Sequence, residues 1–391
     1  MSLLPEAQLS TLDAPWRQDR PVPGWAQWRA SAPYSVGIEE EVMVLDPVDF
    51  SLALDTEQAL HAVPDDLAGH LSVETHEAAI ELATSPCSSV EEAGDELVGL
   101  RSSLLGALEP AGLRAAAAGT HPFAMWTETR VSGGARYQLI FQTMRELARR
   151  EPTFALHVHV GVSDPDSAIV LLNRLRAHVP LLLALSANSP FWQGRDTGMA
   201  SVRTPIFQAF PRVGIPRAFG SYLEYVEAVD QMLRCNAFPE PSFLWWDVRA
   251  RPQFGTIELR VMDAQSTAER SLALAALVQT IAHLELEEGH HDPLLLHAPE
   301  ILDENRFLAA RDGMDARLLD PVNETQVPAR EQLTELLDVA APHAQELGCE
   351  NALELVSEIA LDAGALRQRR IARRTNLNGL VSALARDFSP A

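Results

Sequence analysis

Three apolar stretches of the chain each contain two polar side chains spaced two residues apart. The pairs are Glu39 with Glu41, His157 with His159, and Glu258 with Arg260. Residues two apart in a β-strand project from the same face, so both members of each pair would point in one direction. Two carboxylates about 7 Å apart on one face can each hold one cation of a closely spaced pair. Two imidazoles on one face can bind a metal ion or contact phosphate.

Each pair taken alone also fits an ordinary solvated strand face, and a single His-x-His pair is as often structural as functional. Two further short apolar stretches carry one acidic residue each, Glu74 and Glu81. Independent solvated faces would not be expected to give all three paired patterns between hydrophobic residues. The recurrence therefore favours one shared polar face suited to metal and phosphate chemistry.

The stretches that must position these residues are predicted to be β-strands alternating with helices. The expected strands cover residues 36–45, 71–74, 79–86, 113–118, 154–162, 244–249 and 256–263. Overlapping capping boxes at Ser88 and Ser89 predict a helix that ends near Gly112. Further helices are expected over about 137–150, 164–187 and 217–234. From Ser266, capped by Glu269, the chain is expected to be helical to about residue 386, with breaks near Gly289, Gly313, Pro328 and Gly348. This pattern predicts an α+β fold.

Two loop features bear on a binding site. Residues 199–216 contain Arg203, Arg212 and several prolines and aromatic residues, which fits a loop that covers a substrate or a merely connecting segment. Gly161 follows the two histidines on the same expected strand face and leaves room for another group to approach closely. The arginine cluster at 367–374 is interpreted as solvated surface.

Composition excludes several classes of protein. All 31 basic residues are arginine, so the chain has no lysine for a Walker A motif, a kinase nucleotide site or a Schiff base. A net charge of −23 argues against nucleic-acid or anionic-membrane partners. Three cysteines without metal or redox spacing favour a reducing cytoplasm. The chain has no run of eighteen apolar residues and no secretory signal pattern, so no membrane association is expected.

The expected organisation is an N-terminal arm over residues 1–33, which lies over the body and carries Trp16, Trp25 and Trp28, followed by one domain over 34–391. Residues 264–391 are expected to be the mainly helical part of that domain. We expect the protein to form a homo-oligomer, specifically a dimer.

Four motifs together resemble a known family. They are Gly-Ile-Glu-Glu-Glu at 37–41, Ile-Glu-Leu-Ala-Thr-Ser-Pro at 80–86, His-Val-His-Val-Gly-Val at 157–162, and Trp-Trp-Asp-Val-Arg with Thr-Ile-Glu-Leu-Arg-Val-Met-Asp between 245 and 263. The chain resembles the carboxylate–amine ligases, also called the glutamate–cysteine ligase type 2 family, from about residue 35 to 385. The resemblance implies a glutamine synthetase-like fold, in which a curved, mainly antiparallel sheet holds ATP and divalent metals.

The resemblance also implies roles for individual residues. Glu39, His157 and Glu258 match one metal site, and Glu41, Glu74 and Glu81 match the other. Arg260, with Glu258, is expected to act in catalysis by facing the transferred phosphoryl group. His159 and Arg249 are expected beside the nucleotide, and Arg203 and Arg136 beside the substrates.

The activity implied by this resemblance is ATP-dependent amide formation, of a γ-glutamyl type, through an acyl phosphate with release of ADP and phosphate. Mg²⁺ or Mn²⁺ would serve as the metal, because carboxylate-rich sites favour these ions over zinc. The partners would be ATP and small amino-acid or carboxylate and amine substrates. The alternatives are a metal-dependent hydrolase and a non-catalytic binding protein of the same fold.

Overall fold

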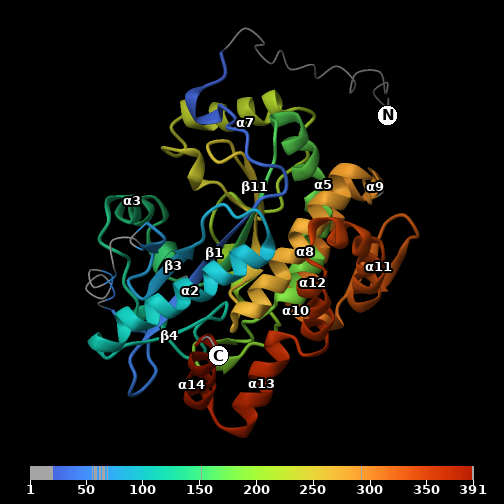
Figure 1. Cartoon of the computed structure of the whole chain (residues 1–391). Helices are drawn as coiled ribbons and strands as arrows, with labels where there is room; N and C mark the ends of the chain where they lie inside the picture. The colour runs from blue at the N-terminus through green and yellow to red at the C-terminus, as the bar shows by residue number, and fades with distance from the viewer. Residues whose placement is uncertain are drawn as a thin grey trace, which may run out of the picture.

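A seven-stranded sheet lies at the centre of the protein (Figure 1). The computed structural model describes residues 21–389, except 55, 57–59, 61–62, 64–66, 68, 151 and 292. The sheet strands are β1 (Val36–Leu45), β2 (Leu71–Val73), β3 (Ala79–Ala83), β4 (Arg114–Ala116), β5 (Ala155–Gly161), β10 (Val248–Arg251) and β11 (Thr256–Asp263). Six of them are ordered β10-β11-β5-β1-β3-β2, β4 pairs with the end of β1, and every ladder is antiparallel.

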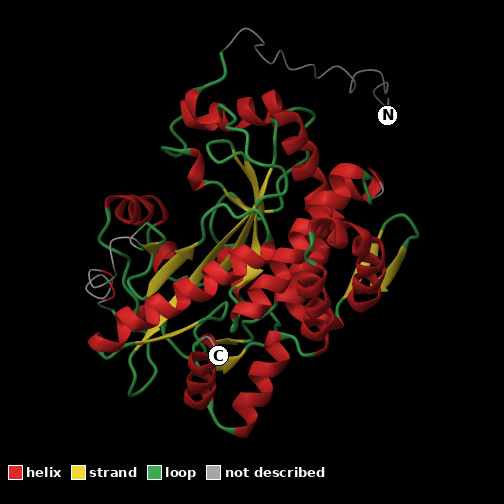
Figure 2. Cartoon of the chain, viewed as in Figure 1, coloured by secondary structure: helices red, strands yellow, loops and turns green. Residues whose placement is uncertain are grey.

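Helices cover the sheet and extend beyond it (Figure 2). They are α2 (Val90–Leu108), α3 (Ala135–Met144), α4 (Glu146–Arg149), α5 (Pro165–Ser186), α6 (Arg203–Phe207), α7 (Tyr222–Arg234), α8 (Ala268–Glu287), α9 (Pro293–Leu296), α10 (Pro299–Asp312), α11 (Ala329–Leu347), α12 (Glu350–Leu361), α13 (Gly364–Arg374) and α14 (Leu377–Phe388). Short pairs join β6 (Phe191–Trp192) to β7 (Arg195–Asp196), β8 (Val213–Gly214) to β9 (Trp245–Trp246), and β12 (Arg317–Asp320) to β13 (Thr325–Pro328). The predicted α+β class is confirmed.

The apolar face of the sheet packs against α2, α5 and α8. Its side chains alternate with the polar ones as the sequence predicts: Ile38 and Val42 on β1, and Val158 and Val160 on β5, are completely buried. Helices α10 and α12 pack on the outer side of α5 and α8. The larger hydrophobic cluster therefore lies on this side of the sheet. A second cluster, which includes Met43, Leu45 and Phe388, lies at the end where β4 and α14 pack, and polar groups occupy the rest of the opposite face.

Helix α5 is, within the described part of the chain, the one helix long and apolar enough to cross a membrane. However, 78% of its most apolar window is buried inside the fold, which is the pattern of a core helix. Asp164 caps it by accepting hydrogen bonds from the backbone amides of Asp166 and Ser167.

The middle carboxylate of β1 belongs to the core side. Glu40 is fully buried and accepts two hydrogen bonds from Arg101 of α2, at 2.6 and 2.8 Å, and one from Ser271 of α8 at 2.7 Å. A buried carboxylate needs such partners to offset its lost hydration. The strand thus separates one structural carboxylate from the two that face the other way.

The arm crosses the outer end of the sheet. Trp25 packs edge-on against Tyr225 of α7, and the indole of Trp28 donates to the carbonyl oxygen of Val162. A Cβ on Gly161 would lie 2.3 Å from the carbonyl oxygen of Ala32, so the space beside this glycine is filled by the arm. Trp16 lies outside the described residues.

Three predicted boundaries in the helical regions are wrong. The helix expected over 137–150 is divided at Arg145, which has a φ of 56°. Between the predicted breaks at Gly313 and Pro328 the chain forms the β12–β13 hairpin in place of a helix, and its turn is held by Asp320 accepting from the amides of Val322 and Asn323. The cap of α8 is Thr267, one residue after the predicted Ser266.

Candidate active site

Cross-strand pairing brings the predicted polar residues onto one face of the sheet. Glu39 of β1 lies opposite His157 of β5, and Glu41 lies opposite Glu81 of β3. In the same way, His159 lies opposite Glu258 of β11. Residues directly opposite in an antiparallel ladder have adjacent side chains on the same face.

A first group of potential ligands consists of Glu39, His157 and Glu258, whose donor atoms lie within 4.8 Å of one another. His157 Nδ1 is 3.2 Å from Glu39 Oε2, and His159 Nε2 is 3.2 Å from Glu39 Oε1. Burial raises the pKa of Glu39, but the two adjacent histidines outweigh it and hold this pKa well below its usual range. Glu39 is therefore an anionic donor at neutral pH.

A second group consists of Glu41, Glu81 and His157, again with donor atoms within 4.8 Å. The imidazole of His157 thus lies between the two groups. Its Nε2 is buried and has no hydrogen-bond partner among the described residues, and it lies 3.9 Å from Glu41 Oε1. Burial and the nearby Arg260 lower the pKa of His157 to about 4, which leaves a neutral imidazole able to ligate a cation.

The second group has an excess of negative charge. Burial, followed by repulsion from Glu74, raises the pKa of Glu41 to about 7. Burial together with Glu39, Glu74 and Glu41 raises the pKa of Glu81 well above its usual range. Such carboxylates share a proton or a cation, because several adjacent anions cannot remain ionised without compensation.

Glu258 has the opposite environment. Arg249 donates to both of its oxygens at 2.8 and 3.0 Å, Arg251 donates at 3.1 Å, and Arg260 donates as well. Burial raises its pKa, but the three guanidinium groups outweigh that effect and lower the pKa well below its usual range. The carboxylate is fully buried and stays ionised.

A β-bulge positions Arg260. Leu259 pairs with Val158, but the next paired residue of β11, Met262, pairs with Leu156, so Arg260 and Val261 together face His157. The backbone amide of Arg260 donates instead to Asp247 at 2.8 Å. A bulge re-aims the extra side chain, and here the guanidinium Nη1 comes within 3.4 Å of His157 Nδ1.

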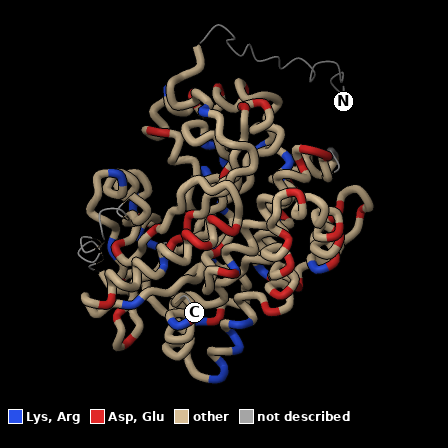
Figure 3. Tube along the Cα trace, in the orientation of Figure 1, with Lys and Arg blue, Asp and Glu red and all other residues tan. Residues whose placement is uncertain are grey.

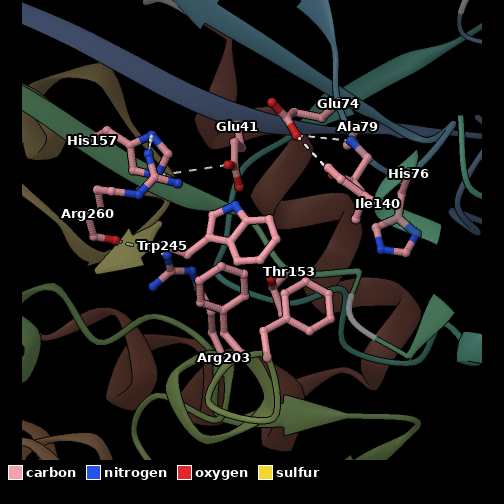
Figure 4. A pocket seen from close by; sticks show the side chains of 13 residues that line it. Glu41, Glu74, His76, Ala79, Ile140, Thr153, His157, Arg203, Trp245 and Arg260 are labelled. Atoms are coloured by element: carbon pink, nitrogen blue, oxygen red, sulfur yellow. Dashed lines mark hydrogen bonds and ion pairs between the residues drawn. The ribbon is translucent and has the colours of Figure 1, made fainter. Parts of the chain in front are cut away.

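A small pocket, with a cavity volume of about 70 Å³, opens beside the second group. Figure 4 shows Glu41 and Glu74 directed into this pocket from the strands above, with Arg203 on the opposite side. The lining residues are Glu41, Glu74, Thr75, His76, Ala79, Ile140, Thr153, His157, Arg203, Phe207, Phe210, Trp245 and Arg260. The pocket therefore combines carboxylates, two arginines and an aromatic wall.

Comparison with known proteins identifies the family. The sequence profile of glutamate-cysteine ligase family 2 matches residues 35–386. The chain belongs to this family. Membership places the protein among ATP-dependent carbon–nitrogen ligases, as the sequence predicts.

Individual relatives agree with this assignment. Two proteins of Rubrobacter xylanophilus, named "Putative glutamate--cysteine ligase 2-1" and "Putative glutamate--cysteine ligase 2-3", are each 41% identical to the chain. The alignments cover 86% and 91% of this chain and 90% and 97% of those relatives. The protein therefore spans nearly the full length of both.

Solved structures of ligases share the fold. The glutamate–cysteine ligase of Francisella tularensis in complex with AMP superposes with a TM-score of 0.67 at 14% identity, over 93% of this chain and 89% of that one. The bifunctional glutathione synthetase of Pasteurella multocida gives 0.69 at 15% identity, over 91% of this chain and 52% of that one. These likenesses confirm the glutamine synthetase-like fold that the sequence predicts.

The structure of this family member brings most of the predicted site residues together. All six predicted metal ligands, with His159 and Arg260, lie on the polar face, and Arg203 lies across the pocket from them. Glu74 forms part of the pocket wall, where its carboxylate accepts from the amide of Thr75 at 2.9 Å. The third member of the second ligand group, beside Glu41 and Glu81, is therefore His157 and not the predicted Glu74.

Three predicted arginines lie elsewhere. Arg249 is buried behind Glu258, where it also donates to the carbonyl of Leu244 at 2.8 Å. Arg136 is exposed and paired with Glu240. Arg212 donates to the carbonyl of Phe243 at 3.0 Å and stacks over Trp245. None of the three lines the pocket around Glu41.

Sequence patterns missed the aromatic wall in part. Phe207 and Phe210 fall within the loop predicted to cover the substrate, and the abundance of aromatic residues there was the available signal. Trp245 belongs to a quoted motif, but its position in the pocket depends on β8 and β9 pairing, which no local pattern indicates. The cluster over 367–374, shown in blue along α13 in Figure 3, is surface as predicted, although Arg369 and Arg370 pair with Asp196 and Asp362.

Proposed function

We propose that the protein joins a carboxylate substrate to an amine through an acyl phosphate, in the manner of a glutamate–cysteine ligase. The supporting observation is the pair of ligand groups that share His157, next to a pocket with Arg260 at its edge. Divalent cations bound by these carboxylates would neutralise the phosphate charge of ATP. Carboxylate-dominated sites suit Mg²⁺ or Mn²⁺.

The residues of the chain would act at two points. Glu258 fixes the guanidinium of Arg260, which is aimed by the bulge at the region between the two ligand groups. There it would stabilise charge that develops on the phosphoryl group in flight. Arg203 is 6% exposed and its Nε has no hydrogen-bond partner among the described residues, so it can donate to a substrate carboxylate.

The reaction would then proceed in two balanced steps. A carboxylate oxygen of the acid attacks the γ-phosphorus of ATP, and the bond to the bridging oxygen breaks to release ADP. The amine nitrogen attacks the acyl carbon, loses a proton and expels phosphate, leaving an amide. The aromatic wall formed by Phe207, Phe210 and Trp245 would exclude water that could hydrolyse the acyl phosphate.

Trapping with hydroxylamine tests this proposal. The protein is incubated with ATP, Mg²⁺, hydroxylamine and a panel of acids, with glutamate first and cysteine as the first natural amine. Equal amounts of hydroxamate and ADP are expected. AMP with pyrophosphate would overturn the γ-phosphoryl mechanism. Phosphate release without a hydroxamate would favour the hydrolase, and no nucleotide turnover with any acid would favour a binding protein.

A further inference from the structure

A second histidine–carboxylate cluster lies away from the polar face of the sheet. It consists of His178 on α5, Glu285 on α8 and His291 in the segment that follows α8, with one donor atom from each within 4.8 Å of the others. Figure 1 shows α5 and α8 side by side, with α9 close to the end of α8. Since α5 and α8 cover the apolar face of the sheet, the cluster is separated from Glu39 and Glu41 by the core.

The cluster is preorganised by its own contacts. His178 and Glu285 are 1% and 0% exposed, and His178 Nε2 is 2.6 Å from Glu285 Oε1. The backbone amide of His290 donates to the other oxygen of Glu285 at 3.1 Å, which fixes the carboxylate plane. The His291 ring stacks on that of His178 with centroids 4.2 Å apart. A carboxylate is rarely buried so completely unless it is paired or holds a cation.

The cluster is also accessible from one side. His178 and His291 form part of the wall of a cavity of about 290 Å³, whose other walls come from α11 and the β12–β13 turn. Asp320, Asn323 and Glu335 also line this cavity. A cation can therefore reach the cluster from solvent, and a water molecule can occupy a remaining coordination position.

We propose that His178, Glu285 and His291 form a transition-metal site that binds Zn²⁺ in preference to Mg²⁺. Two imidazoles with one carboxylate and an open fourth position are a common zinc donor set, whereas Mg²⁺ prefers oxygen ligands and retains its waters. In a tetrahedral site with bonds of about 2.0–2.1 Å, ligand atoms lie about 3.3 Å apart. Binding therefore replaces the His178–Glu285 hydrogen bond and widens that contact.

The consequence of binding follows from the elements that supply the ligands. The metal would connect α5, α8 and the segment leading to α9. The last residue of α9, Leu296, already accepts a hydrogen bond from Arg176 of α5 at 3.0 Å. An ion that binds the folded chain and not the unfolded one stabilises the fold in proportion to its concentration over its dissociation constant. Zn²⁺ should therefore stabilise the protein without entering the pocket around Glu41.

Zn²⁺ titration in the presence of saturating Mg²⁺ tests the site. Saturating Mg²⁺ would compete for the carboxylate groups of the polar face, and the difference between wild type and His291→Ala in equilibrium dialysis then identifies the Zn²⁺ bound at the cluster. One Zn²⁺ per chain and a higher Tm are expected. The variant His291→Ala should lower the affinity for Zn²⁺ at least tenfold. Even the residues that support the ligands of a metal site typically cost roughly 10–100-fold in affinity when they are mutated. His297→Ala, an exposed histidine nearby, is the matched control and should bind as the wild type does.

A second measurement detects the metal site by its absorption spectrum and does not depend on the stability of the variants. Co²⁺ in place of Zn²⁺ should give visible absorption typical of a four-coordinate site in the wild type and in Glu81→Gln, and lose it in His291→Ala. Loss in Glu81→Gln but not in His291→Ala would overturn the proposal. The proposal would also be overturned if the wild-type protein bound no Zn²⁺ in the presence of saturating Mg²⁺.

Discussion

The two ends of the polar face differ in how their carboxylates are compensated. Glu258 is surrounded by Arg249, Arg251 and Arg260, and its pKa is low in spite of complete burial. Glu41 and Glu81 face each other with Glu74 nearby, and their pKa values are raised because burial and mutual repulsion exceed the attraction of the arginines. One end is neutralised by the chain itself, and the other needs protons or cations from solvent.

The largest effect is expected from Glu258→Ala. Alternation along the strand alone predicts that this variant keeps its fold, but the contacts with three buried or partly buried arginines change that expectation. Removing one partner of a buried ion pair costs about 3–5 kcal/mol. Urea unfolding of the metal-free protein should show this loss. Glu81→Gln is the control from the other end, and it should be neutral or stabilising because it removes repulsion. Equal stability of the two variants would contradict the comparison.

Arg260→Lys should reduce turnover by roughly 10²–10³, a typical cost of a lost transition-state donor. A lysine ammonium lacks the forked geometry with which Arg260 reaches both Glu258 and the pocket. Initial rates of ADP release at saturating ATP measure the effect. Arg251→Lys alters the same carboxylate from outside the pocket and should retain most of the rate. Near wild-type turnover of Arg260→Lys would sink the assignment.

The grouping of carboxylates in the second set predicts a ranking of variants. Glu81 lies with Glu41 and His157 within ligand distance, whereas Glu74 is held by the amide of Thr75 on the pocket wall. Losing a supporting residue of a metal site typically costs about 10–100-fold in affinity, and losing a ligand should cost at least as much. Glu81→Gln should therefore weaken Mn²⁺ binding by about tenfold or more, and Glu74→Gln should weaken it by less. Calorimetric titration with Mn²⁺ measures the affinity of both variants. A larger loss of affinity in Glu74→Gln than in Glu81→Gln would indicate that Glu74 is the ligand.

The smallest effect concerns pH. The pKa of Glu41 is raised to about 7 in the folded chain, so its favourable contribution is complete below the unfolded value near 4 and is lost as pH rises through 7. The metal-free protein should lose on the order of 1 kcal/mol per such carboxylate between pH 6 and 8. Mg²⁺ relieves the repulsion, so the rise in Tm with Mg²⁺ should be larger at pH 8 than at pH 6. A rise that is larger at pH 6 would contradict the raised pKa.

Sequence predicts the faces of the strands better than it predicts their partners. The two-residue period is a local property, so the orientation of Glu39, Glu41 and His157 follows from the sequence alone. The bulge at Arg260 depends on the neighbouring strand, and a one-residue change of register has no local signal. Likewise, whether Glu81 or Glu74 joins Glu41 depends on the pairing of β1 with β3.

The partners of arginine side chains are the least predictable feature of the site. Arg249 and Arg136 are predicted beside the nucleotide and the substrates, and in the structure the first donates to Glu258 and the second pairs with Glu240. Nothing in a sequence indicates whether an arginine meets a ligand or a carboxylate of its own chain, because both contacts use the same guanidinium geometry.

The buried helix α5 has a consequence for how the protein is made. Its apolar surface packs against β11, α8 and α10, of which α8 spans Ala268–Glu287, whereas α5 ends at Ser186. A ribosome that adds about 5–20 residues per second takes roughly 5–20 seconds to synthesise the chain from the end of α5 to the end of α8. During that interval the nascent chain presents a segment with the hydropathy of a membrane anchor. Yield in cells should therefore depend on chaperones that hold this segment until translation has passed residue 287.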